Sequence, residues 1–140
     1  MSHTKKMNPV VHFEMSAENK KRMAEFYTKV FGWKAEHLGS EMGNYVLVQT
    51  TETDDKGMIK APGNINGGLY EKSKPDQYTR ITIAVDDIRE AMKEVTAAGG
   101  TVLGGMQKPG EPDEIPDVGL YVTFIDTEGN LASMLQPKGM

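Results

Sequence analysis

The predicted secondary structure has the same order twice along the 140-residue chain, and this internal repeat limits the choice of fold most strongly. In residues 10–15, apolar and polar side chains alternate, which predicts a half-buried strand. Ser16 offers an N-cap, and apolar residues then recur at helical spacing as far as Gly32, which predicts an amphipathic helix. Three further strands are expected within residues 33–71. Together these elements make one βαβββ unit.

Residues 78–136 repeat the order of strand, helix and three strands. Aligning the two transitions from strand to helix gives an offset of 68 residues (80 − 12 = 68), which pairs apolar positions with apolar positions, such as Phe13 with Ile81. A sheet that cannot bury its own apolar face needs its copy to complete the core. We therefore predict a single α+β domain over residues 1–140, with one βαβββ module at about residues 8–71 and another at about residues 78–137.

Composition excludes several kinds of function. Sixteen basic and twenty acidic residues give a net charge of −4, which is too small and too evenly spread to indicate nucleic acid or an anionic membrane as a partner. The chain has no cysteine, which excludes disulfides, thiolate metal sites and a cysteine nucleophile. The apolar run at residues 10–15 is too short for a signal segment or a membrane span. We expect a cytoplasmic protein whose ligand is a small molecule.

Three segments carry a family resemblance: residues 10–14, 24–33 and 124–130, with the sequences VVHFE, AEFYTKVFGW and FIDTEGN. In this order and spacing they make the chain resemble the vicinal oxygen chelate superfamily of glyoxalases, bleomycin-resistance proteins and extradiol dioxygenases. Within it, the chain is similar to the bacterial lactoylglutathione-lyase-related group. The resemblance implies that the two modules form a curled eight-stranded mixed sheet. It also implies a homodimer with its site at or near the interface.

The resemblance implies four metal ligands, one from the first and one from the last strand of each module. His12 matches the first of these positions, but the equivalent position in the second module is Arg80, whose guanidinium cannot coordinate a cation. The remaining two positions fall near Gly68 and on Ser133, where metal-dependent members carry a carboxylate. His12 is therefore the single metal candidate. We expect no cofactor, with a divalent metal as the alternative.

The first strands of the two modules still carry residues that could act in catalysis without a metal. Glu14 can take a proton next to a carbonyl group and Arg80 can stabilise the resulting negative charge, so we name these two as candidate catalytic residues. The candidate substrate-binding residues line the expected cavity or its walls: His12, Trp33, Tyr45, Tyr121 and Ser133.

Three hypotheses remain open for the function of this site. The first is a protein that binds a small polar or dicarbonyl-type molecule without the metal chelate. The second is a metal-dependent glyoxalase-type lyase or dioxygenase-related enzyme. The third is a dimer that sequesters its ligand without chemistry, as bleomycin-resistance proteins do. Against all three stands a purely structural role, in which His12, Glu14 and Arg80 pair as a satisfied polar group. The Gly- and Pro-rich segments 61–68 and 108–119 are predicted as loops and are candidate lids.

Overall fold

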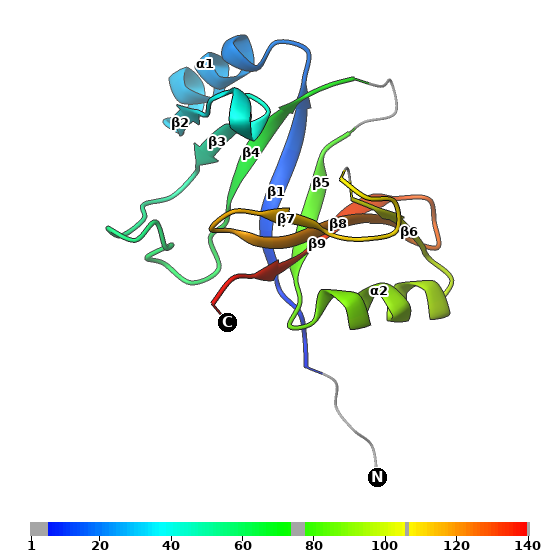
Figure 1. Ribbon diagram of the computed structural model, residues 1–140. Helices are drawn as coiled ribbons and strands as arrows, with labels where there is room; N and C mark the ends of the chain where they lie inside the picture. Colours follow the sequence, from blue (N-terminus) through cyan, green and yellow to red (C-terminus); the bar gives the residue numbers. More distant parts are fainter. Residues whose placement is uncertain (1–5, 74–77, 106, 140) are drawn as a thin grey trace. The chain divides into compact units, whose positions relative to one another are not determined.

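The computed structural model describes residues 6–73, 78–105 and 107–139. Over these ranges the chain forms two α-helices and nine strands, and the α+β class predicted from the sequence is confirmed (Figure 1). Contacts between residues divide the chain into two compact units. The first unit comprises residues 12–80, and the second comprises residues 1–11 and 81–140.

The first unit has the predicted βαβββ order. Strand β1 is parallel to β4, β4 is antiparallel to β3, and β3 is antiparallel to β2. A short 3-10 turn, η1 (Ser40–Met42), lies between β2 and β3. The other elements are β1 (Val10–Ala17), whose first two residues belong to the second unit, α1 (Lys20–Phe31), β2 (Lys34–His37), β3 (Val46–Gln49) and β4 (Asn66–Glu71).

Helix α1 begins three residues later than the sequence pattern suggested. Its N-cap is Asn19, whose side chain accepts a hydrogen bond of 2.9 Å from the backbone N–H of Arg22, while Ser16 is still part of β1. Gly32 ends the helix in the left-handed conformation, with φ of 73°, which glycine adopts without steric cost. The predicted end of the helix is therefore confirmed and its predicted start is corrected.

Helix α1 covers one face of the first unit's sheet. Ala24 of the helix is buried with Val46, Val48 and Leu69, and five partly buried residues pack against this cluster: Phe13, Met15, Met23, Trp33 and Ala35. Successive side chains of a strand point to opposite faces of its sheet. Phe13 and Met15 face the helix. His12 and Glu14 alternate with them along β1 and therefore lie on the opposite face of the sheet.

The second unit repeats this arrangement with one extra strand. Strand β5 is parallel to β9, and β8 is antiparallel to β9, β6 and β7. A second core packs against α2 around Val85, Ile88, Val122 and Met134. The elements are β5 (Arg80–Ala84), which starts on the last residue of the first unit, α2 (Ile88–Ala97), β6 (Thr101–Gly104), β7 (Asp113–Ile115), β8 (Gly119–Ile125) and β9 (Leu131–Pro137).

The extra strand corrects the predicted strand count from eight to nine. Strand β7 lies inside segment 108–119, which the sequence predicts as a loop, and its three residues pair with β8. In the other predicted loop, residues 61–68, β4 begins at Asn66, and the Asn66 side chain accepts a hydrogen bond of 2.7 Å from the backbone N–H of Thr50. Parts of both candidate lids are thus tied into the sheets. No helix in the described part of the chain is long and apolar enough to cross a membrane.

Candidate functional site

The face of the first unit's sheet that points away from α1 carries a group of interacting polar side chains. We call this group the polar cluster, and it consists of His12, Glu14, Tyr45, Tyr70 and Arg80. His12 and Glu14 come from β1, Tyr45 directly precedes β3, Tyr70 lies in β4, and Arg80 is the last residue of the unit. The alternation of β1 therefore selects two members of the cluster, and the pairing of β1, β3 and β4 brings in two more.

Glu14 is the centre of the polar cluster and is only 7% exposed. Its Oε1 lies 3.1 Å from Nε of Arg80, and its Oε2 accepts a hydrogen bond of 3.0 Å from the hydroxyl of Tyr45. The Arg80 guanidinium also lies 4.6 Å from the centre of the Tyr70 ring, within cation–π range. A buried carboxylate is costly unless it is paired and hydrogen-bonded, and Glu14 meets both conditions.

His12 joins the polar cluster through Tyr45. Nε2 of His12 lies 3.1 Å from the Tyr45 hydroxyl oxygen. Burial lowers the pKa of His12 from its ordinary value, because the charged imidazolium loses solvation, and the negative charge of Glu14 opposes this effect only in part. His12 is therefore a neutral imidazole at neutral pH. Burial also raises the pKa of the Tyr70 phenol, against the opposing charge of Arg80.

Gly68 makes room for the Tyr45 hydroxyl. In the register of the sheet, Gly68 of β4 lies opposite Glu14 on one side and Leu47 on the other. A Cβ atom placed on Gly68 would overlap the hydroxyl end of the Tyr45 ring. A glycine inside a strand often marks a place where another group approaches the backbone closely. The absence of a side chain at residue 68 is what lets Tyr45 reach Glu14.

These residues do not fit a metal chelate. Of the four positions that the family resemblance implies, one is a guanidinium and one is a glycine whose side-chain space is occupied by Tyr45. Ser133 belongs to the second unit, and its Oγ lies 2.6 Å from the hydroxyl of Tyr121. Within residues 6–73, 78–105 and 107–139, no three His, Cys, Asp or Glu side chains come together as metal ligands would.

The structure brings together four of the residues selected from the sequence, namely His12, Glu14, Tyr45 and Arg80. It does not place Trp33 with them. The Trp33 ring stacks on Tyr27 of the helix at 4.6 Å between ring centres, and so lies on the α1 side of the sheet. Tyr121 and Ser133 form their own hydrogen-bonded pair in the second unit.

Tyr70 is a member of the polar cluster that was not selected as a site residue. The available signal is its position two residues after Gly68, which puts both residues on the same face of β4. Its partner Arg80 is ten residues further along the chain (80 − 70 = 10), beyond a Pro- and Lys-containing connection, so local pattern does not reveal the stacking.

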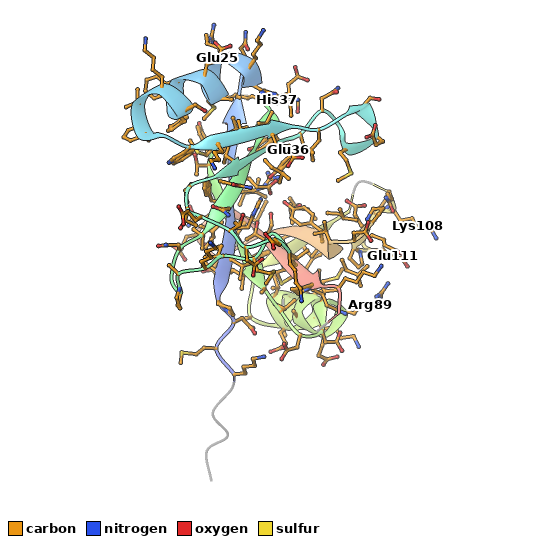
Figure 2. All side chains as sticks on the ribbon, turned by 90° about the vertical axis from the view of Figure 1, so that its left-hand side faces the viewer. Glu25, Glu36, His37, Arg89, Lys108 and Glu111 are labelled. Atoms are coloured by element: carbon orange, nitrogen blue, oxygen red, sulfur yellow. The ribbon has the colours of Figure 1, made fainter. Side chains whose placement is uncertain are left out.

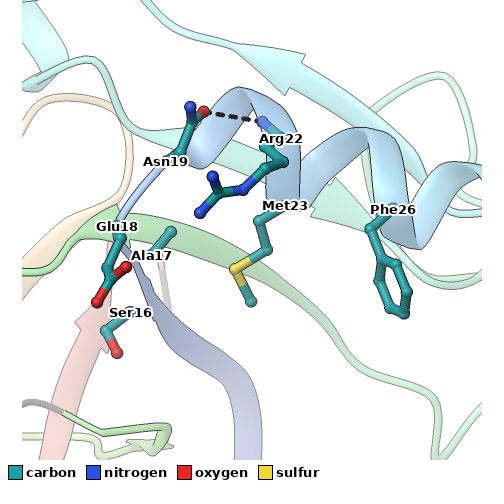
Figure 3. Close-up of a pocket in the computed structure, with 7 residues that line it drawn as sticks. All are labelled: Ser16, Ala17, Glu18, Asn19, Arg22, Met23 and Phe26. Atoms are coloured by element: carbon teal, nitrogen blue, oxygen red, sulfur yellow. Dashed lines mark hydrogen bonds between the residues drawn. The ribbon is translucent and has the colours of Figure 1, made fainter.

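Two shallow hollows lie beside α1 in the first unit. One is lined by residues around the start of the helix, from Ser16 to Phe26, and contains the Asn19 cap (Figure 3). The other lies between α1 and β2 and includes Glu25 and His37 (Figure 2). Neither hollow is lined by His12, Glu14, Tyr45 or Arg80. Tyr70 of the polar cluster hydrogen-bonds to the side chain of Ser16, which lines the first hollow, so the cluster borders that hollow.

Comparison with known proteins fits a fold made of two such units. The sequence model of the Glyoxalase/Bleomycin resistance protein/Dioxygenase superfamily matches residues 10–133, so the chain belongs to this superfamily. A glyoxylase-like domain-containing protein of Didymella fabae is 31% identical over 130 residues, which cover 90% of this chain and 91% of that protein.

Solved structures with the same fold include methylmalonyl-CoA epimerases. One, in complex with methylmalonyl-CoA and NH4+, has a TM-score of 0.67 at 16% identity and covers 96% of this chain and 97% of its own. The methylmalonyl-CoA epimerase of Mycobacterium tuberculosis has a TM-score of 0.62 at 12% identity, with 91% of this chain and 87% of its own covered. At these identities the likeness shows the fold alone.

Proposed function

We propose that this protein binds a small, polar, carbonyl-bearing molecule at the polar cluster, without a metal ion. The observation that carries the proposal is the set of contacts that joins Glu14 to Arg80 and Tyr45 on the same sheet face as His12, where the family resemblance implies a metal ligand. A guanidinium beside a carboxylate, a phenol and an imidazole offers both donors and acceptors for a carbonyl or hydroxyl group.

The charges of the polar cluster limit the charge of its ligand. Arg80 and Glu14 neutralise each other, and His12 adds no positive charge at neutral pH because burial lowers its pKa. A dianion would find no uncompensated positive charge here. The ligand that suits the cluster best is neutral or carries a single negative charge.

Binding is better supported than proton abstraction by Glu14. Both Glu14 oxygens accept hydrogen bonds from the protein, one from Arg80 and one from Tyr45, and Glu14 is only 7% exposed, which makes it a weaker and less accessible base. A metal-dependent lyase or dioxygenase is disfavoured by the incomplete ligand set. A ligand-sequestering protein and an enzyme that uses the polar cluster without metal share the same binding site, and turnover measurements separate them.

The first experiment measures metal content and ligand binding together. Protein purified without a chelator is analysed for metals, and binding of hydroxyacetone, pyruvate and methylglyoxal is followed by thermal shift and titration in EDTA. We expect no stoichiometric metal and binding that persists in EDTA. Stoichiometric metal, binding abolished by EDTA, or turnover that requires added nickel, cobalt or zinc would contradict the proposal.

Three variants locate the binding site. Arg80→Lys keeps the charge but loses the planar guanidinium, and Arg80→Ala removes both, so we expect progressively weaker binding, by about tenfold or more for alanine. Arg89→Ala is the matched control, because Arg89 is an exposed residue of α2. A ligand whose dissociation constant is the same in all three variants binds elsewhere.

We also propose a homodimer, which the family resemblance supports, and a cytoplasmic location, with which the lack of cysteine is compatible. Members of the superfamily act as dimers, and a two-fold pair would cover exposed strand edges. Light scattering at several protein concentrations tests this proposal. A monomer at the concentrations used for binding would refute it.

A further inference from the structure

The direction of the hydrogen bonds in the polar cluster follows from its carboxylate. A carboxylate only accepts hydrogen bonds, so the Tyr45 hydroxyl donates to Oε2 of Glu14 at 3.0 Å. A hydroxyl has one proton, so the Tyr45 oxygen must act as the acceptor in its 3.1 Å contact with Nε2 of His12. Nε2 therefore carries a proton. Glu14 thus sets the tautomer of His12 through Tyr45.

A neutral imidazole has a single N–H, which leaves Nδ1 of His12 as an acceptor. The His12 ring makes no other hydrogen bond with the described residues. The charged groups in the polar cluster are Glu14 and Arg80, which pair with each other, and burial lowers the pKa of His12 and so supports its neutral form.

We infer that the site selects ligands that present a hydrogen-bond donor, a hydroxyl or N–H group, to Nδ1 of His12, and that Tyr45 is the specificity-determining residue. If a ligand presents only an acceptor, such as an ether or a ketone oxygen, the lone pair of that oxygen meets the lone pair of Nδ1, and the two repel each other. The inference rests on the proposed binding function for its ligand, but the tautomer of His12 is a property of the free protein. Gly68 is required because a side chain there would displace the Tyr45 hydroxyl.

The tautomer is tested first, without ligand. In uniformly ¹⁵N-labelled protein at pH 7.5, two-bond ¹H–¹⁵N spectra distinguish a protonated ring nitrogen from an unprotonated one, and His12→Gln identifies the His12 signals. We expect Nε2–H in the native protein. Tyr45→Phe removes the acceptor of that proton, so the ring should become a mixture of tautomers. Tyr78→Phe is the matched control, since Tyr78 is 69% exposed.

A second pair of variants tests the space at residue 68. Gly68→Ala keeps Tyr45 but should displace its hydroxyl, and we expect the same mixture of tautomers as in Tyr45→Phe. Gly39→Ala is the control, because its added methyl group would meet only the flexible side chain of Glu41. A protonated Nδ1 in the native protein, or a tautomer unchanged in both Tyr45→Phe and Gly68→Ala, would overturn the inference.

Selectivity is tested with hydroxyacetone and methoxyacetone, which differ only in that a methyl group blocks the donor. We expect the native protein to bind hydroxyacetone at least about tenfold more tightly, and Tyr45→Phe to reduce this ratio several-fold while Tyr78→Phe preserves it. Equal affinity of the native protein for the two compounds, with the Nε2–H tautomer present, would overturn the inference but leave the proposed function intact. Binding of neither compound nor of the wider panel would refute the proposed function, and the spectra would still decide the tautomer.

Discussion

The two units place a tyrosine at the same point of the same strand arrangement, and the residue it meets decides what the tyrosine does. Tyr45 lies two residues before Leu47, which pairs with Gly68, and Tyr121 lies two residues before Thr123, which pairs with Ser133. Because Gly68 has no side chain, the Tyr45 hydroxyl passes over it to Glu14. In the second unit, the Tyr121 hydroxyl meets Oγ of Ser133 at 2.6 Å.

The residues that lie opposite Gly68 and Ser133 on the neighbouring strands also differ between the two units. Glu14 lies opposite Gly68 and has both carboxylate oxygens hydrogen-bonded, whereas Thr82 lies opposite Ser133. Oγ1 of Thr82 is the one buried side-chain nitrogen or oxygen without a hydrogen bond among the described residues. Positions 14 and 82 are related by the same offset of 68 residues that the sequence repeat shows (82 − 14 = 68). Two differences, glycine against serine and glutamate against threonine, thus distinguish the charged cluster of the first unit from the hydroxyl pair of the second.

The largest expected effect comes from breaking the ion pair of the first unit. Arg80→Ala leaves the Glu14 carboxylate buried without its cation, and loss of one partner of a buried pair costs about 3 kcal/mol or more. Urea unfolding measures this loss. Lys6→Ala in the second unit is the control, because the Lys6–Asp86 pair is exposed and exposed pairs contribute less than about 1 kcal/mol. Equal losses in the two variants would show that the Glu14–Arg80 pair is not held away from solvent.

The substitution Gly68→Ser tests directly whether residue 68 decides which group the Tyr45 hydroxyl contacts. The serine should push the Tyr45 ring aside and hold its hydroxyl near residue 68, as Ser133 holds Tyr121, so that Oε2 of Glu14 loses its donor. Crowding of this kind costs roughly 1–3 kcal/mol, measurable by urea unfolding. A variant as stable as the native protein, with the His12 tautomer unchanged, would contradict this account of Gly68.

The alternation of residues 10–15 predicts the face on which His12 and Glu14 lie, because the period of a strand is two and Phe13 marks the buried side. The contacts of Glu14 with Tyr45 and Arg80 join residues 31 and 66 positions apart, and they depend on strand pairing that local pattern does not specify.

Other features escaped prediction for different physical reasons. Strand β7 has only three residues and lies in a Gly- and Pro-rich segment, so it has no strand signal of its own. Trp33 follows the helix-ending Gly32, and sequence alone does not show that its ring turns back to stack on Tyr27. Ser16 and Asn19 are both good capping residues, and the pairing of β1 with β4 through Ala17 decides in favour of Asn19.

A smaller effect is expected in the second unit, where the hydroxyl groups can be removed one at a time. Thr82→Val removes a buried hydroxyl that has no hydrogen-bond partner among the described residues, so we expect the unfolding free energy to rise by about 0.5–1 kcal/mol. Ser133→Ala removes one hydrogen-bond partner of Tyr121 and should lower the unfolding free energy by about 1 kcal/mol. Opposite signs in urea unfolding would support the comparison. A lower unfolding free energy in Thr82→Val would show that the Thr82 hydroxyl does have a hydrogen-bond partner.

The smallest expected effect is a pH dependence confined to the first unit. Burial lowers the pKa of His12 in the folded protein, so below the ordinary value of 6.5 the unfolded chain binds a proton that the folded protein does not. Stability from this residue is therefore present above pH 6.5 and decreases as the pH falls toward the folded pKa. In urea unfolding between pH 7.5 and 5, His12→Gln should lose less stability than the native protein. If His12→Gln also follows the native curve, His12 is not held neutral by burial, and the acceptor role assigned to Nδ1 of His12 loses its support.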